Sequence, residues 1–433
     1  MPHSNAILAM TRGRLCRWTF RAAFWAGILG FHLAIPWVFL PRHNPIPDEG
    51  AYTNLAANLA TKGSYHLDYP SYWHTAGQPN THFAPGWPAL LSLGYLALGG
   101  EAGFWWVIGA VWCANAVLIF TLARTLDLPL FCCRLLVLWL TLNPLFIFYH
   151  AHLMSEALTI TACLGITILG LLFIKRPSWR AVVLLGIVAA LGHLVRTQTL
   201  LAALAVWLVA GALFSWRDLF GYGCIFTITY TAILAPWLWR MNEVGAGMTA
   251  TELKLGVNLY SFSGTATADP YGQPAESDWQ WPPGIESASP RERNNALVRS
   301  ALREIAAHPE RYLARCLKRL TFLLSPVPNF YDVSPLQYWA VMVSSLLFFH
   351  AFLAAVAARA LWPVRLNVDQ WTLLLSLGLW YLLHVLINAS IRNRLPSDVW
   401  CAALAVSLWV QPGPALWGSS SGSSASDELQ VER

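Results

Sequence analysis

The sequence predicts an all-α polytopic membrane protein. Apolar segments long enough to cross a bilayer recur from one end of the chain to the other. Of the 433 residues, 56% are hydrophobic and only 12% are charged, which is about half the charge of a typical soluble domain. The 23 Trp residues agree with this class, because indole rings concentrate at membrane–water interfaces.

The first apolar run extends from about Trp18 to Leu40 and follows a basic segment, residues 1–17, with Arg12, Arg14 and Arg17. This run is too long for the core of a signal peptide, and no small-residue cleavage motif follows it. We therefore predict an uncleaved first transmembrane helix. The eight Cys residues form no CxxC motif, and most lie in or beside apolar runs, so no disulfide framework is predicted.

Further spans are expected from apolar length at Phe104–Ala123, Leu135–Tyr149, Ala157–Ile174, Ala181–Val195, Thr197–Phe214, Phe220–Trp239, Tyr338–Ala358, Trp371–Asn388 and Pro396–Val410. Segment 83–99 is also apolar, but it is short and opens with Pro85, Gly86 and Pro88. It therefore reads either as a span or as a re-entrant or interfacial helix.

Positive charge in the short loops distinguishes these alternatives. If segment 83–99 does not cross, one side of the membrane collects Arg12, Arg14, Arg17, Arg124, Arg134, Lys175, Arg176, Arg180, Arg217, Arg359 and Arg365. Such a side is typical of a cytoplasmic face. If the segment crosses, Arg124 and Arg134 lie on the outer side, and the basic loop residues no longer collect on one side of the membrane. We predict the version in which it does not cross.

The predicted organisation is a cytoplasmic N-terminus (1–17), one transmembrane domain (18–410) and a disordered low-complexity tail (411–433). The outer face then holds loops 41–101 and 240–335, which we expect to form a cavity. Within the second loop, Asn294–Leu323 shows helical spacing of apolar positions opposite several basic residues. This pattern predicts an amphipathic helix lying on the membrane.

Three carboxylates on the predicted outer face are candidate catalytic groups. Asp48 and Glu49 begin a helix-like stretch with an apolar stripe that includes Tyr52, and capping of that helix is the simpler explanation for them. Glu156 opens an apolar helix, where a carboxylate is costly and therefore a functional candidate. The simpler explanation for Glu156 is that it stabilises the N-terminus of the helix from the first turn, with Ser155 as the N-cap. The predicted topology puts Asp48 and Glu156 on the same face of the membrane, which favours a functional role for both over simple helix capping.

Four arginines occur at the predicted outer ends of spans: Arg196, Arg240, Arg392 and Arg394. A guanidinium group stays charged and can bind phosphate oxygens in pairs. Each arginine alone is more often an interfacial anchor. Arg196 is the strongest phosphate candidate, because it interrupts two apolar runs with almost no polar linker. Carboxylates and arginines at one membrane surface suit a substrate with a hydroxyl, a phosphate and a lipid tail.

These residues resemble the GT-C superfamily of polytopic glycosyltransferases, and in particular the bacterial branch related to protein O-mannosyltransferases and the aminoarabinose transferase of lipid A. The resemblance begins with Asp48-Glu49, Tyr52 and Gly63. It continues in order with four stretches, HFAPGWPALL from His82, LMSEAL from Leu153, LVRTQ from Leu194 and RNRLP from Arg392, and loop 240–335 is similar. Each motif alone is weak, but five in order are fairly specific.

The resemblance implies an all-α bundle with an outer cavity that uses polyprenyl-phosphate sugars, such as those of undecaprenyl phosphate. It implies that Asp48 corresponds to the family's catalytic carboxylate in the first loop and Glu156 to the acidic residue of the second outer loop. His82 falls where some relatives place a metal or substrate contact. This chain has His where the aminoarabinose transferases have Glu, so an interfacial histidine remains the simpler reading, and whether a divalent metal takes part is left open.

The predicted function is sugar transfer from a polyprenyl-phosphate donor to a hydroxyl acceptor (lipid, glycan or protein) at the periplasmic face of the inner membrane, by direct displacement. Asp48 is the predicted base, Glu49 its fallback, and Glu156 orients acceptor or metal. Tyr52, His82 and the four arginines are predicted to bind substrate. The alternatives are a polymerase or ligase using polyprenyl diphosphate donors and, third, a transporter. Nothing in the sequence resembles a nucleic-acid site.

Overall fold

The structure is a computed structural model that describes residues 2–39, 47–70, 76–248, 252–263, 285, 288–325, 335–361, 366–387 and 391–411. Across these residues the secondary structure is helical, apart from one isolated antiparallel bridge between His66 and Pro79. The predicted all-α class is confirmed. Of the predicted tail 411–433, residues 412–433 lie outside the described residues.

The helices follow one another as α1 (Pro2–Phe39), α2 (Pro47–Lys62), α3 (Gly86–Leu98), α4 (Ala102–Thr125), α5 (Leu130–Leu142), α6 (Pro144–His150), α7 (Glu156–Lys175), α8 (Trp179–Val195), η2 (Thr197–Thr199), α9 (Leu200–Leu213), α10 (Trp216–Glu243), α11 (Leu255–Ser263), α12 (Pro290–Ala307), α13 (Pro309–Leu324), α14 (Pro335–Ser344), η4 (Ser345–His350), α15 (Ala351–Ala360), α16 (Val368–Leu386), η5 (Ile391–Arg394) and α17 (Leu395–Val410). Each segment expected to be helical contains helix, although several of these segments are divided into two or more helices.

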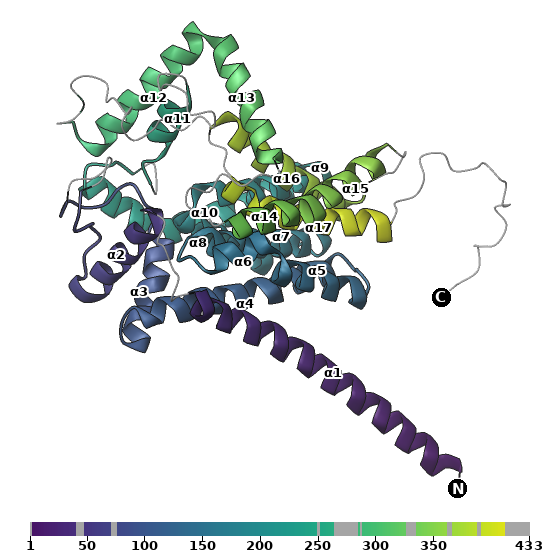
Figure 1. The fold of residues 1–433 in the computed structure, drawn as a ribbon. Helices are drawn as coiled ribbons and strands as arrows, with labels where there is room; N and C mark the ends of the chain where they lie inside the picture. Colours follow the sequence, from purple (N-terminus) through teal and green to yellow (C-terminus); the bar gives the residue numbers. More distant parts are fainter. Residues whose placement is uncertain are drawn as a thin grey trace, which may run out of the picture.

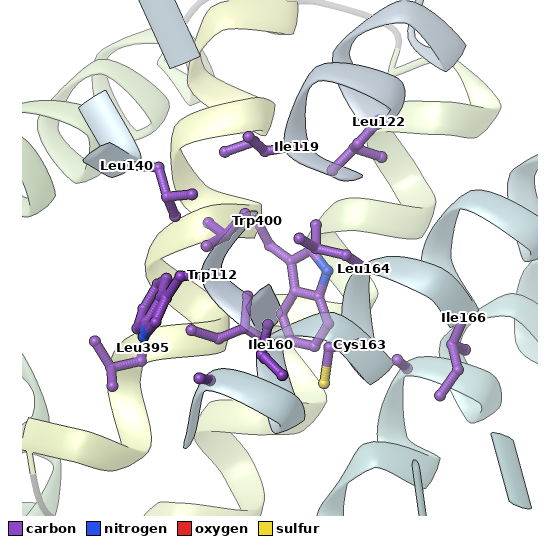
Figure 2. Close-up of a cluster of buried hydrophobic side chains, with 14 of the residues drawn as sticks. Trp112, Ile119, Leu122, Leu140, Ile160, Cys163, Leu164, Ile166, Leu395 and Trp400 are labelled. Carbon is purple, nitrogen blue, oxygen red and sulfur yellow. The ribbon is translucent and has the colours of Figure 1, made fainter. Parts of the chain in front are cut away.

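The core lies around α7 and α17. Helix α7 packs against α4, α8 and α9, while α17 packs against α15 and α16 and also contacts α7. Both helices are apolar around most of their circumference, as expected for helices surrounded by other helices. Trp400 of α17 is fully buried and donates its Nε1–H to Thr167 Oγ1 of α7 at 3.1 Å. Figure 2 shows Trp400 in this core with Cys163 and Leu164 of α7.

Several of these helices are suited to a bilayer. Among the described residues, five helical segments are long and apolar enough to cross a membrane, and the bent pair α5–α6 would make a sixth. Helix α3 has 13 residues, a length of about 20 Å. That is shorter than the hydrocarbon core of about 30 Å, as are α8 and the segment Thr197–Leu213, and whether segment 83–99 crosses stays a prediction.

Two predicted helices are each divided at a proline. The expected span Leu135–Tyr149 is bent by 57° between α5 and α6, because Pro144 cannot continue the hydrogen-bond pattern of α5 and the Asn143 side chain caps α6. The expected single helix Asn294–Leu323 is wrong. It divides into α12 and α13 at His308, which has extended φ of −136° and ψ of 60° before Pro309.

Two ends of the bundle can be distinguished. Helices α2 and α3 lie together at the end away from the N-terminus of α1, and α11, which packs against α12, lies toward the same side (Figure 1). We call this the site end, and the N-terminus of α7 belongs to it. At the opposite end, the C-terminal Lys175 of α7 pairs with Asp127 after α4 at 3.5 Å and with Asp369 of α16 at 2.7 Å.

Candidate active site

Four charged side chains from four separate segments meet at the site end. Asp48 of α2 accepts a hydrogen bond from Arg392 of η5, with 2.7 Å between Oδ2 and Nη1. Glu156 of α7 pairs with Arg196, which follows α8, at 2.7 Å between Oε1 and Nη2. Arg392 Nε also lies 3.8 Å from Glu156 Oε1. The two carboxylates are therefore connected through Arg392 and form one cluster.

Asp48 is the accessible carboxylate of this cluster, with 29% of its side chain exposed against 1% for Glu156. Burial raises the pKa of Asp48, but the positive charges of Arg392 and Lys254 lower it by more. The pKa is consequently held well below its usual value, and the group is ionised throughout the physiological range.

Glu49, next to Asp48, points into the protein instead. Its Oε1 accepts the backbone N–H of Leu153 at 2.8 Å, and its Oε2 lies 3.1 Å from His152 Nδ1. Only 2% of Glu49 is exposed. Glu49 thus holds the 151–155 turn against α2, and that turn leads directly to Glu156.

Glu156 and its neighbour Ser155 differ from the simple capping arrangement. Ser155 makes no side-chain capping bond to α7. Its hydroxyl instead accepts from Arg196 Nε at 3.1 Å and lies 3.2 Å from the Tyr52 hydroxyl. The second carboxylate oxygen of Glu156 is buried and has no hydrogen-bond partner among the described residues. An unsatisfied buried oxygen is costly, and in a native protein it calls for an explanation such as a catalytic role or a bound ion or water.

The stretch that begins at His82 supports the cluster. Gly86 lies so close to α8 that an added Cβ would be 2.8 Å from the carbonyl oxygen of Leu194. Trp87 donates to the carbonyl of Leu153 at 2.8 Å. These contacts fix the segments that carry Arg196 and Glu156. His82 itself packs edge-on against Phe83.

Arg240 lies over the rings of Trp237 and Tyr65, with distances of 4.6 and 5.3 Å from its guanidinium carbon to the respective centroids. It donates to the carbonyl of Asn80 at 2.7 Å and to that of Tyr65 at 3.3 Å. In this structure it connects α10 to the segment between α2 and α3, and a direct contact with substrate stays a prediction.

Arg394 is fully buried. Its Nε lies 3.0 Å from Asp398 Oδ1, and it donates to Ser345 Oγ at 2.6 Å. It also donates to the carbonyls of Leu323 at 3.3 Å and Ser325 at 3.1 Å. These contacts join η5 to the end of α13 and to η4, so Arg394 holds the segment that presents Arg392.

We expect the variant Arg394→Met to be strongly destabilised, because it leaves the Asp398 carboxylate buried without its partner. Removal of one member of a buried ion pair costs about 3–5 kcal/mol. A double variant, Arg394→Met with Asp398→Leu, should recover much of the loss. Thermal unfolding in detergent measures this. A single variant with unchanged Tm but no activity would instead favour the predicted contact with substrate.

Two contributors were missed in the sequence. Lys254 lies just before α11 and lowers the pKa of Asp48, with its Nζ 4.2 Å from the centre of the Phe83 ring. His152 is the partner of Glu49. Loop 240–335 contains many basic residues, so nothing in the pattern distinguishes Lys254. His152 precedes the LMSEAL stretch and could have been included with it.

The carboxylates of the cluster, Asp48 and Glu156, are not free to bind a divalent metal ion. Each carboxylate of the cluster is paired with an arginine at 2.7 Å, and a cation would have to displace it. Within the described part of the chain, no three His, Cys, Asp or Glu side chains are grouped as metal ligands would be.

The fold, though not the sequence, is similar to that of known proteins. No family model and no curated protein matches the sequence. Among solved structures, the chain is similar to the apo oligosaccharyltransferase of Archaeoglobus fulgidus, with 12% identity and a TM-score of 0.52 over 90% of this chain. The match covers 51% of that protein, so this chain spans about half its length.

A second similar structure is ArnT from Cupriavidus metallidurans bound to undecaprenyl phosphate, with 14% identity over 89% of this chain and 78% of that one. Its TM-score is 0.41, so the assignment of the fold rests on the first comparison. The apolar helices and the likeness to the oligosaccharyltransferase agree with the all-α architecture expected from the sequence. The described chain therefore shares the helical fold of the part of the archaeal oligosaccharyltransferase that it matches.

Proposed function

We propose that the protein is a membrane glycosyltransferase that moves a sugar from a polyprenyl-phosphate donor to a hydroxyl acceptor. The observation that carries the proposal is the convergence of Asp48, Glu156, Arg196 and Arg392 from four segments at one end of the bundle. Burial of charge at the end of a transmembrane bundle is costly, and such clusters mark substrate sites. The GT-C-type fold and the motif resemblance support the same reaction class.

Asp48 acts as the base. Transfer requires a group that accepts the proton of the acceptor hydroxyl as its oxygen attacks the anomeric carbon. Asp48 is ionised and partly exposed, whereas both oxygens of Glu49 already have partners. Asp48 is therefore preferred over Glu49.

Arg392 and Arg196 hold the donor phosphate. The leaving phosphate is already stable as an anion, so it needs positive charge rather than a strong general acid. Arg392 is about one third exposed. When phosphate binds to Arg392, the guanidinium charge is shared between two anions. Asp48 then becomes a stronger base at the moment when the sugar is in place.

Glu156 orients the acceptor. Its unpaired oxygen can accept a hydrogen bond from the acceptor hydroxyl or from a sugar hydroxyl, while Arg196 holds the other oxygen. Direct displacement with one base inverts the anomeric centre. The proposed orientation places this cluster at the periplasmic face, as the distribution of basic loop residues favours.

The proposal is tested by incubation of the purified full-length protein in detergent with a panel of polyprenyl-monophosphate sugars and hydroxyl acceptors. We expect transfer from a monophosphate donor, and NMR of the product should show inverted anomeric configuration. Transfer only from diphosphate donors would favour the polymerase or ligase alternative. Turnover in detergent, where no compartments exist, would exclude a transporter.

A further inference from the structure

A second basic site lies at the opposite end of the bundle. A cavity of about 320 Å³ lies between α1, α4 and α5, within the size range of small-ligand pockets. Three of its lining residues are arginines, one from each helix: Arg21, Arg124 and Arg134. Aromatic residues, among them Trp25 and Phe120, form much of the remaining wall.

Helix α7 shows where the cavity lies relative to the active-site cluster, because the two sites are near its opposite ends. Arg124 is in the last turn of α4, and Asp127, which follows it, pairs with Lys175 at the C-terminus of α7. Glu156 of the active-site cluster is at the N-terminus of the same helix. A helix of 20 residues is about 30 Å long, which equals the thickness of the hydrocarbon core. The cavity thus lies at the other membrane boundary from the active-site cluster.

The three guanidinium groups have no acidic partner within the described part of the chain, since none of its ion pairs includes them. Arg124 donates one long bond of 3.4 Å to the carbonyl of Leu128. Arg134 lies over the Phe20 and Phe24 rings at 5.1 and 5.8 Å. Three like charges around one cavity repel one another, so an anion between them would be stabilising.

The aromatic wall indicates that this anion has an apolar part. The Trp25 ring meets the rings of Phe24 and Phe120 edge-on, with centroid distances of 5.5 and 5.3 Å. This apolar surface lies beside the arginines and along transmembrane helices, where acyl chains are the surrounding solvent. Inorganic phosphate would use only the arginines, whereas a phospholipid would use both surfaces.

We propose that this cavity binds the phosphate head group of an anionic phospholipid from the leaflet opposite the active site. Basic pockets between transmembrane helices are suited to such head groups. Because the arginines come from α1, α4 and α5, the lipid joins the first helix to the bundle and stabilises the packed state. This inference depends on the position and charge of the cavity and not on glycosyl transfer.

Delipidated full-length protein in a neutral detergent tests the proposal. Phosphatidylglycerol should raise the Tm, while phosphatidylcholine and inorganic phosphate at the same concentrations should not. In the variants Arg21→Gln and Arg134→Gln, the lipid concentration that gives the half-maximal Tm shift should rise by at least roughly fivefold, since each basic group near anionic lipid contributes about that factor. Arg21→Lys keeps the charge and should keep most of the response.

The matched controls are Arg180→Gln and Arg217→Gln. These arginines begin α8 and α10 at the same end of the bundle, and each stacks on its neighbouring Trp, at 5.4 and 5.5 Å. Both controls should respond to phosphatidylglycerol as the parent does. The proposal is overturned if the controls lose the response equally, if inorganic phosphate reproduces the shift, or if Arg21→Gln and Arg134→Gln respond normally.

Discussion

Replacement of Asp48 by Asn is expected to reduce glycosyl transfer by roughly 10²–10⁴-fold, the usual contribution of a positioned general base. The amide has nearly the same shape as the carboxylate, but it cannot accept the acceptor's proton. Because Asp48 is partly exposed and at the start of α2, the variant should fold and insert normally. The measurement is kcat with a fixed monophosphate donor, at protein levels matched by Tm and expression.

Glu49→Gln is the comparison that distinguishes the adjacent acids. The amide oxygen can still accept from the N–H of Leu153, but the charge opposite His152 is lost. We expect a smaller loss of activity, accompanied by a lower Tm. If Asp48→Asn retains full activity and Glu49→Gln loses it at an unchanged Tm, Glu49 is the base. If both single variants and the double variant remain active, neither carboxylate is the base.

The architecture was largely predictable because its signals are local. Long apolar runs and the sign of the loop charges gave the helices and placed Asp48 and Glu156 at one surface. The two divided helices were less clear, since apolar spacing continues across Asn143-Pro144 and His308-Pro309. In both cases the proline was the visible signal, and only the geometry of the preceding residue shows how far the chain turns there.

The partners within the site were not predictable, because they depend on contacts between residues far apart in the chain. Arg392 and Arg394 are two residues apart in one motif, yet Arg392 reaches Asp48 and Arg394 is buried against α13. Likewise, Asp48 and Glu49 are adjacent, and only the position of the Leu153 N–H shows that Glu49 points inward. A motif identifies such residues as a group, but packing decides which of them face the substrate.

Arg392→Gln is expected to reduce kcat/KM by roughly 10–100-fold, because the donor phosphate loses a charge-assisted contact, and to change the pH dependence as well. A base works in its ionised form, so activity falls as pH drops through its pKa. Arg392 contributes most of the charge that lowers the pKa of Asp48 in the native protein, while burial raises it. Without Arg392 this pKa rises, and the acid limb of kcat/KM should move to higher pH.

Arg392→Lys is the matched control, since it keeps the charge but loses the paired donors of the guanidinium group. It should lose activity while keeping an acid limb close to that of the parent. The parent itself should show an acid limb at higher pH in kcat than in kcat/KM, because bound phosphate shares the charge of Arg392 and Asp48 then regains basicity. An Arg392→Gln profile that coincides with the parent's would show that Arg392 does not control the pKa of the base. The proposed sharing of the Arg392 charge between Asp48 and the donor phosphate would then have to be abandoned.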